Sequence, residues 1–180
     1  IPFEDVNDAM ALLHREMRHL QDLVHPNIVR VFDCDRDGDT VFMTMEYLAG
    51  STLTSKVRAP GFTGVAAAEA LPIIRSIATA LEFAHGKRVV HGDLTPGNVM
   101  LAASGAVKVI DFGIARLIAD PVKAFMGRAS ARADAVTGVT PAYASPQMLE
   151  SRSADLRDDV YSLGCIAWEL LTGSHPFNRK

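Results

Sequence analysis

The hydrophobic positions in the N-terminal part of the chain follow two different periods. Apolar side chains recur at alternating steps of four and three between residue 5 and about residue 23, which is the spacing of one helical face. The runs at 28–33 and 40–48 are short and rich in β-branched and aromatic residues, which predicts two strands. The Asp-Gly-Asp sequence at 37–39 between them predicts a hairpin turn.

The rest of the chain predicts two long helices. Residues 49–64 contain Gly, Pro, Ser and Thr and are expected to be a connector with one short helix. The first long helix is predicted over about 65–85, and the second over about 159–172 with Gly173 ending it. The second helix is apolar almost all round, which is typical of a helix buried in the middle of a domain. The face of the first helix expected to be buried carries Leu71, Ile74, Ala78, Leu81 and His85.

Between these helices the pattern is shorter and less regular. Apolar runs at 89–90, 99–101 and 107–110 alternate with turn residues and predict short strands. The segment 114–147 shows little periodicity, and a segment of that length inside a compact domain is usually functional or mobile.

Composition and charge narrow the possible classes. The chain has 180 residues and a net charge of −3, which gives no support for a nucleic-acid partner. Its two cysteines are far apart, which fits a reducing compartment and suggests neither a metal site nor a disulfide framework. No apolar run approaches the roughly 20 residues of a membrane span. Because the chain begins at Ile1 and not at Met, the lack of a signal peptide or anchor carries no information.

Three acid or amide side chains stand at positions that suggest phosphate chemistry. Asp93 and Asn98 are five apart on one loop, and Asp111 follows the apolar strand "VKVI". A strand, a turn and a strand between Asn98 and Asp111 would bring both to one end of a hairpin, where oxygen ligands suit Mg²⁺ or Mn²⁺. Asp93 beside them could accept the proton of an attacking hydroxyl. Each residue alone is typical of a turn, but the spacing of the trio favours a site.

Six ordered motifs make the chain similar to the eukaryotic-type, or Hanks-type, protein kinases. "HGDLTPGN" resembles the catalytic loop of that family, and "DFG" at 111–113 matches its metal-binding motif. "REMRHLQDLVHPNIVRV" resembles helix αC and the following strand, and "MTMEYLAG" resembles the hinge. "TPAYASPQ" and "DDVYSLGCIAWELLTGSHPF" resemble the end of the activation segment and helix αF. The last two look most like bacterial serine/threonine kinases.

The resemblance implies a fold and an activity. The fold would be a truncated α+β, bilobal kinase fold, with residues 1–48 forming part of the N-lobe and hinge and residues 49–180 part of the C-lobe. The activity would be transfer of the ATP γ-phosphate to Ser or Thr hydroxyls of a protein substrate in the cytoplasm. Whether the parent protein is anchored in a membrane, and its oligomeric state, are left open.

The resemblance also implies roles for individual residues. Asp93 would be the catalytic base, Asn98 and Asp111 would hold the metal, and Thr95 would contact the transferred phosphate. Asp159 would hold the catalytic loop through backbone hydrogen bonds, and the Thr140 hydroxyl would contact Asp93. His91, Phe112, Leu20 and Val31 would form a packed column that links the two lobes. The ATP-binding residues would be Glu16, Met45 as gatekeeper, Glu46, Tyr47, Leu48 and Met100.

Several positions depart from the family pattern. Gly92 replaces an arginine that reads an activation-loop phosphate, Thr95 replaces a lysine that touches the transferred phosphate, and Gln147 replaces the glutamate of Ala-Pro-Glu. Losing one charged contact to the transferred phosphate is worth roughly 3 kcal/mol, or about 10²-fold in rate, which predicts an attenuated site. The family's Gly-rich loop and ATP-binding lysine would lie upstream of Ile1, so the 180 residues alone are expected to be inactive.

These departures leave two alternative functions open. The first is a pseudokinase that acts as a scaffold, although Asp93, Asn98 and Asp111 are all retained. The second is a small-molecule kinase of the aminoglycoside or choline type, whose catalytic loops also contain His-Gly-Asp. Those families lack the "TPAYASP" and "DVYSLG" segments that this chain contains.

Overall fold

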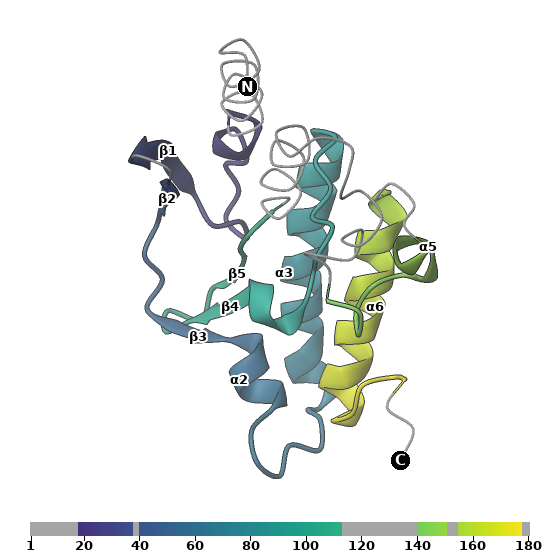
Figure 1. Ribbon diagram of the computed structural model, residues 1–180. Coiled ribbons are helices and arrows are strands. Elements are labelled where there is room, and N and C mark those ends of the chain that lie inside the picture. The colour runs from purple at the N-terminus through teal and green to yellow at the C-terminus, as the bar shows by residue number, and fades with distance from the viewer. Residues whose placement is uncertain (1–17, 38–39, 113–139, 151–154, 178–180) are drawn as a thin grey trace.

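The structure of the chain is a computed structural model that describes residues 18–37, 40–112, 140–150 and 155–177 (Figure 1). Residues 18–21 are helical, and the remainder of the helix expected over 5–23 lies outside the described residues. Glu16, expected to contribute to ATP binding, also lies outside them, as does most of the segment 114–147.

Two small antiparallel sheets lie on the left of the molecule in the view of Figure 1. The first is the predicted hairpin of β1 (Val31–Asp37) and β2 (Thr40–Met45), with Asp37 opposite Thr40 at the turn. The second contains β3 (Gly50–Thr52), β4 (Val99–Ala102) and β5 (Val107–Val109) in that order. Strand β3 was not predicted, and the strand expected at 89–90 is not formed.

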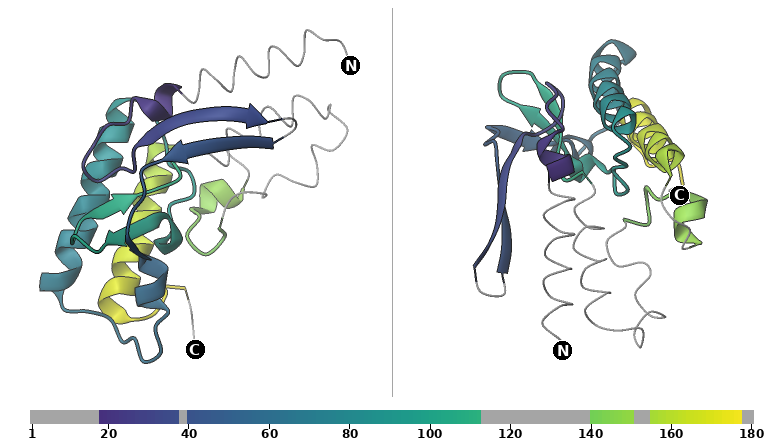
Figure 2. Two further views of the ribbon diagram at one scale, coloured as in Figure 1. Left: turned by 90° about the vertical axis from the view of Figure 1, so that its left-hand side faces the viewer. Right: turned by 90° about the horizontal axis from the view of Figure 1, so that it is seen from above.

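The helices form the other layer. α2 (Leu53–Val57) is the short helix expected in the connector, and α3 (Ala67–Gly86) confirms the first long helix. α5 (Pro146–Leu149) is one turn long, and α6 (Leu156–Thr172) confirms the second long helix. α3 and α6 lie side by side in all views, and β5 lies beside α3 (Figures 1 and 2). The segment 91–98, which resembles the kinase catalytic loop, lies against α3 and α6.

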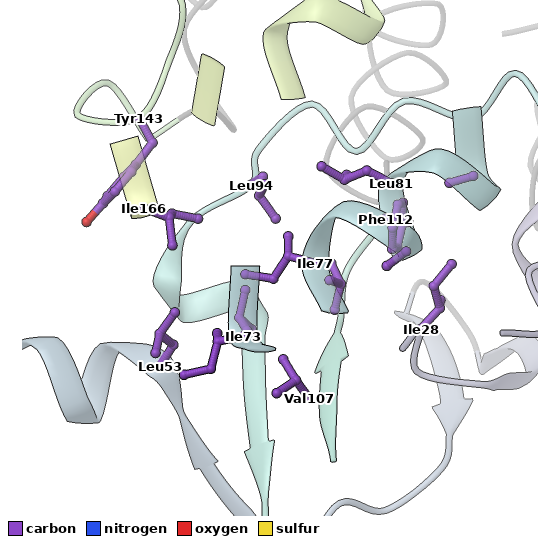
Figure 3. Packing of buried hydrophobic residues seen from close by; sticks show 14 of the residues in the cluster. Ile28, Leu53, Ile73, Ile77, Leu81, Leu94, Val107, Phe112, Tyr143 and Ile166 are labelled. Carbon is purple, nitrogen blue, oxygen red and sulfur yellow. The ribbon is translucent and has the colours of Figure 1, made fainter. Parts of the chain in front are cut away.

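The predicted buried face of α3 is confirmed in part, since Leu81 is buried and Ile74 packs against the core. The buried side chains are Ala70, Ile73, Ile77, Ala80, Leu81 and Ala84, whereas Leu71 is 56% exposed. Successive residues on a helix are about 100° apart, so a shift of the pattern by one residue rotates the helix by that angle. Ile73 and Ile77 point into the core together with Val107 of β5 and Leu94 (Figure 3).

The expectation that α6 is buried all round was also wrong. Val160 and Trp168 are 61% and 53% exposed, whereas the buried positions include the polar Asp158, Asp159, Ser162 and Glu169. These polar groups are buried because they hydrogen-bond to distant segments of the chain, as described below. Gly173 ends α6 in the left-handed conformation with φ 74°, as predicted.

One hydrophobic core joins both layers and reaches the catalytic loop. Figure 3 shows Leu94, from that loop, pointing into the space between Ile77 and Ile166. Leu94 and Ile166 are 1% and 0% exposed. Fully burying a leucine contributes about 1.5–3 kcal/mol, so Leu94 anchors the loop firmly between α3 and α6. The positions of its neighbours Asp93, which is partly exposed, and Thr95, which is buried, are fixed by this anchor.

Candidate functional site

The β4–β5 hairpin brings the predicted trio together. Val99 pairs with Val109, and the Ile110 N–H donates to the Asn98 carbonyl oxygen at 2.9 Å, so Asn98 lies beside the residue that precedes Asp111. The Asn98 side-chain amide donates to the Asp93 carbonyl oxygen at 2.8 Å, which closes the loop between them. This hydrogen bond uses the amide nitrogen and leaves the amide oxygen as the atom that could bind a cation.

Asp111 has an unusual backbone and a perturbed carboxyl group. Its φ is +61°, a left-handed conformation that few residues other than glycine adopt and that is often found at functional sites. Desolvation raises the pKa of Asp111, and the nearby charge of Asp93 raises it further, whereas His91 acts in the opposite direction.

His91 is a structural residue that orients the loop around Asp93. It is 1% exposed, and its Nε2–H donates to the Ile110 carbonyl oxygen at 3.0 Å while its Nδ1 accepts the Asp93 N–H at 3.3 Å. Burial lowers the pKa of His91, and the charge of Asp159 opposes that shift. The two hydrogen bonds require the neutral ring, in agreement with this direction.

Asp159 of α6 holds the catalytic loop, as predicted. Its carboxylate accepts the backbone N–H groups of His91 and Gly92, each at 2.9 Å. His85, at the end of α3, donates from Nε2 to the same carboxylate at 2.7 Å. The side chain of Asp159 is 1% exposed, so its charge depends on these donors. The loop is thus fixed to both long helices at the residues immediately before Asp93.

Replacing Asp159 with asparagine is expected to release the loop. Removing the charge that accepts three hydrogen bonds should cost about 3 kcal/mol of local stability. Hydrogen–deuterium exchange of peptides that cover residues 89–94 in the full-length protein should therefore become about 10²-fold faster. Asp155→Asn is the matched control, because Asp155 is half exposed and asparagine is an equally good N-cap. Unchanged protection in Asp159→Asn would show that these hydrogen bonds do not hold the loop.

The predicted column of apolar side chains is present. The ring of Phe112 lies 4.8 Å from that of His91, and Phe112 is buried. A small apolar cavity between β1, β2 and the residues before them is lined by Leu20, Val31 and Phe112, among others, and by Asp111 at one edge. The column therefore runs from the helical residues 18–21 to the catalytic loop.

Thr95 has a local structural role. Its hydroxyl oxygen accepts the Gly97 N–H at 3.2 Å and caps the short 3-10 helix Pro96–Asn98, and the residue is 8% exposed. A hydroxyl that accepts one hydrogen bond can still donate another. Contact between Thr95 and a phosphate remains a prediction.

The expected contact between Thr140 and Asp93 exists, but through a different atom. The backbone N–H of Thr140 donates to Asp93 Oδ1 at 2.8 Å, whereas the side-chain hydroxyl had been expected to make the contact. A backbone donor does not depend on the residue type, so this contact fixes the position of the segment and not its sequence.

The expected adenine-binding residues lie on the connection between β2 and β3. Met45 ends β2, and Tyr47 is 91% exposed in the segment that also contains Glu46 and Leu48. Met100 of β4 is partly buried and pairs with Lys108 of β5. The ammonium group of Lys108 donates to the Glu46 carboxylate, so β5 is tied to this connection.

The hydrogen-bond partners of several groups that build the site were not predicted. Lys108, His85 and Ser145 each bind a partner at least 13 residues away, so no local pattern indicates them. Within the described part of the chain, no group of three or more His, Cys, Asp or Glu side chains could hold a metal ion. An Asn–Asp pair is nevertheless sufficient for Mg²⁺, which usually keeps water and phosphate in its shell. In the same described part, no helix has the length and apolar character needed to cross a membrane.

Comparisons with known proteins agree with this geometry. The family model described as "Protein kinase domain" matches residues 3–180. Serine/threonine-protein kinase PknB of Mycobacterium leprae is 40% identical over 167 residues, which are 91% of this chain and 25% of that protein. The probable serine/threonine-protein kinase PknB of Corynebacterium glutamicum is 39% identical over 168 residues, with the same shares of 91% and 25%.

A solved structure has the same fold. The crystal structure of the Mycobacterium tuberculosis PknI kinase domain superposes with a TM-score of 0.72 at 25% identity, and the match covers 97% of this chain and 60% of that chain. The chain thus spans about a quarter of the length of the curated relatives named above and more than half of a solved kinase domain.

Proposed function

The chain belongs to the protein kinase family, and on that premise we propose that it forms the catalytic part of a serine/threonine kinase. The substrate would be a protein with a Ser or Thr hydroxyl, by analogy with the serine/threonine kinases of the PknB type to which the chain is similar. The single observation that carries the proposal is the arrangement of Asp93, Asn98 and Asp111, which the catalytic loop and the β4–β5 hairpin bring together.

Each member of the trio has a role in the transfer. Asp93 orients the acceptor hydroxyl and accepts its proton, while the hydroxyl oxygen bonds to the γ-phosphorus and the bond to the bridging β–γ oxygen breaks, releasing ADP. The side-chain oxygens of Asn98 and Asp111 would bind a divalent cation, Mg²⁺ or Mn²⁺, which neutralises charge on the phosphates. The hydrogen bond between Asn98 and the Asp93 carbonyl oxygen keeps base and metal ligand at a fixed separation.

The nucleotide would lie between the two sheets. Protein kinases use ATP with a divalent metal ion, and here the backbone of Glu46–Leu48 would face the adenine while Met100 would lie beneath it. Glu46 is held on both sides, since Lys108 binds its carboxylate and its N–H donates to the Arg30 carbonyl oxygen at 2.9 Å. Met45 would border the inner edge of the pocket and Glu16 would pair with an ATP-binding lysine. This placement of the nucleotide puts the boundary between the N-lobe with its hinge (1–48) and the C-lobe (49–180) after residue 48.

The test is Mg²⁺-dependent transfer by the full-length protein. Radiolabelled ATP, a generic acceptor protein and hydrolysis to single amino acids would identify the phosphorylated residue. We expect phosphoserine or phosphothreonine, and no transfer to small alcohols such as choline. Label on small alcohols alone would identify a small-molecule kinase, and ATP binding without transfer would identify a scaffold. Gly92 and Thr95 are the observations that favour the scaffold, because both positions lack a cation.

Replacing Thr95 with lysine is expected to raise the rate of transfer. A positive charge aimed at the transferred phosphate should increase kcat by about 10-fold to 100-fold. The loss of the Thr95 cap should lower stability by about 1 kcal/mol, which Thr95→Ala would measure on its own. Steady-state kinetics on the two variants separate these effects. An unchanged or lower kcat in Thr95→Lys would mean that this position does not reach the phosphate.

A further inference from the structure

Two adjacent carboxylates in the first turn of α6 are buried, and the catalytic loop uses only one of them. Asp158 and Asp159 are 4% and 1% exposed. Both follow the N-cap residue Asp155, at the helix end whose free N–H groups stabilise negative charge. Asp159 accepts the catalytic-loop amides, whereas Asp158 accepts hydrogen bonds from a different segment.

Asp158 joins the start of α5 to the start of α6. The hydroxyl of Ser145 donates to Asp158 Oδ1 at 2.5 Å, and the Asp155 N–H donates to Oδ2 at 2.7 Å. Ser145 is 2% exposed, and its oxygen also accepts the Met148 N–H at 3.1 Å as the N-cap of α5. Both oxygens of this buried carboxylate therefore have partners, which is the condition under which a buried charge is tolerated.

Ser145 ends the segment that reaches Asp93. The segment starts at Thr140, whose N–H donates to Asp93, and it turns back on itself because the Tyr143 N–H donates to the Thr140 carbonyl oxygen at 3.0 Å. The Ser162 hydroxyl of α6 donates to the Tyr143 carbonyl oxygen at 2.8 Å. The hydrogen bond between Ser145 and Asp158 therefore holds the end of this turn, and the Ser162 hydroxyl holds its middle.

We propose that Asp158 is a positioning residue for the phospho-acceptor, an inference that rests on the proposed kinase function. Asp159 fixes the loop that carries Asp93, and Asp158, one residue earlier, fixes the 140–145 segment that touches Asp93. The first turn of α6 thus positions both the loop that carries Asp93 and the 140–145 segment. An acceptor hydroxyl must approach between these two segments. The nucleotide is held elsewhere, by the β2–β3 connection and β4. Removing the hydrogen bonds of Asp158 should therefore raise the KM for the acceptor and leave the KM for ATP unchanged.

The variants Asp158→Asn and Ser145→Ala test this in the full-length protein. In Asp158→Asn, one of the two acceptor oxygens becomes an NH₂ group, so the side chain can no longer accept both the Ser145 hydroxyl and the Asp155 N–H. With radiolabelled ATP and myelin basic protein, we expect the KM for the acceptor to rise about fivefold or more and the KM for ATP to change less than about twofold. The acceptor KM of the double variant should equal that of the more strongly affected single variant, because both substitutions remove the same hydrogen bond between Ser145 and Asp158.

Leu170→Val is the matched control, since it loosens α6 at a fully buried site near the other end of the helix without removing a polar contact. It should leave both KM values unchanged. Equal rises in both KM values for Asp158→Asn, or an unchanged acceptor KM, would overturn the proposal. If Asp158→Asn does not fold, Ser145→Ala gives the same comparison.

Hydrogen–deuterium exchange provides a second measurement that does not need activity. Peptides covering residues 140–145 should lose protection in Asp158→Asn and Ser145→Ala, whereas peptides covering 89–94 should keep it. Absence of transfer by the unaltered protein would contradict the proposed function, and retained protection at 140–145 would contradict the role of Asp158. The two failures are therefore distinguishable.

Discussion

Replacing Asp93 with asparagine is expected to reduce kcat for transfer to a protein acceptor by about 10³-fold in the full-length protein. Asparagine is nearly the same size and can still accept the Thr140 N–H, but it cannot take up the proton of the acceptor hydroxyl. The fold should be preserved, because the Asp93 backbone makes the local contacts: its N–H donates to His91 and its carbonyl oxygen accepts from Asn98.

Two further measurements make this result specific. Binding of ATP with Mg²⁺, measured by calorimetry, should change less than about threefold, since Asp93 is assigned to the acceptor side. Asp22→Asn, at an exposed position after the helical residues 18–21, should leave kcat unchanged. Transfer at more than about a tenth of the unaltered rate in Asp93→Asn would contradict the assignment of Asp93 as the base.

The trio was predictable because its members are close in sequence as well as in space. Asp93 and Asn98 share one loop, and a single hairpin separates Asn98 from Asp111, so residue spacing and turn chemistry were sufficient. The same applies to Gly173, where a glycine follows the last apolar residue of a helix. Local patterns predict local geometry well.

The groups that fix the trio in place could not be predicted from spacing alone. The Asp159 carboxylate accepts the N–H of His91, which is 68 residues away, and Asp158 accepts the hydroxyl of Ser145. A periodicity argument treats aspartate as a surface residue, so it gave no reason to expect Asp158 and Asp159 among the buried positions of α6. The resemblance to kinases supplied the role of Asp159, but nothing in the sequence indicated a role for Asp158.

The error on α3 has a different origin. Residues 66–84 contain many alanines, with isoleucines and leucines spread over different sides of the helix, so several helical faces are nearly equal in hydrophobicity. The choice between them is made by β5 and the catalytic loop, which present Val107 and Leu94 to Ile73 and Ile77. Tertiary packing decides the rotation of such a helix.

Replacing Asp111 with asparagine is expected to have the second-largest effect, a loss of about 10³-fold in kcat at saturating acceptor. The variant keeps an oxygen ligand but removes the negative charge that would bind the cation, so its need for Mg²⁺ should rise steeply. Asparagine also tolerates the left-handed backbone found here, with φ +61°, which makes misfolding an inadequate explanation for the loss. Titration of activity with Mg²⁺ and with Mn²⁺ measures the effect, and full activity at the usual Mg²⁺ concentration would exclude Asp111 as a ligand.

Repeating the Mg²⁺ titration of activity at several pH values separates the effect of the Asp111 charge from the effect of its side-chain shape. Desolvation and the charge of Asp93 raise the pKa of Asp111, so the proton stays bound up to a higher pH than on an isolated aspartate. Because proton and cation compete for this carboxylate, the Mg²⁺ concentration for half-maximal activity should increase as the pH falls toward that raised pKa. Asparagine has no proton to lose, so Asp111→Asn should abolish this increase. A metal requirement that varies with pH equally in both proteins would place the titrating group elsewhere in the site.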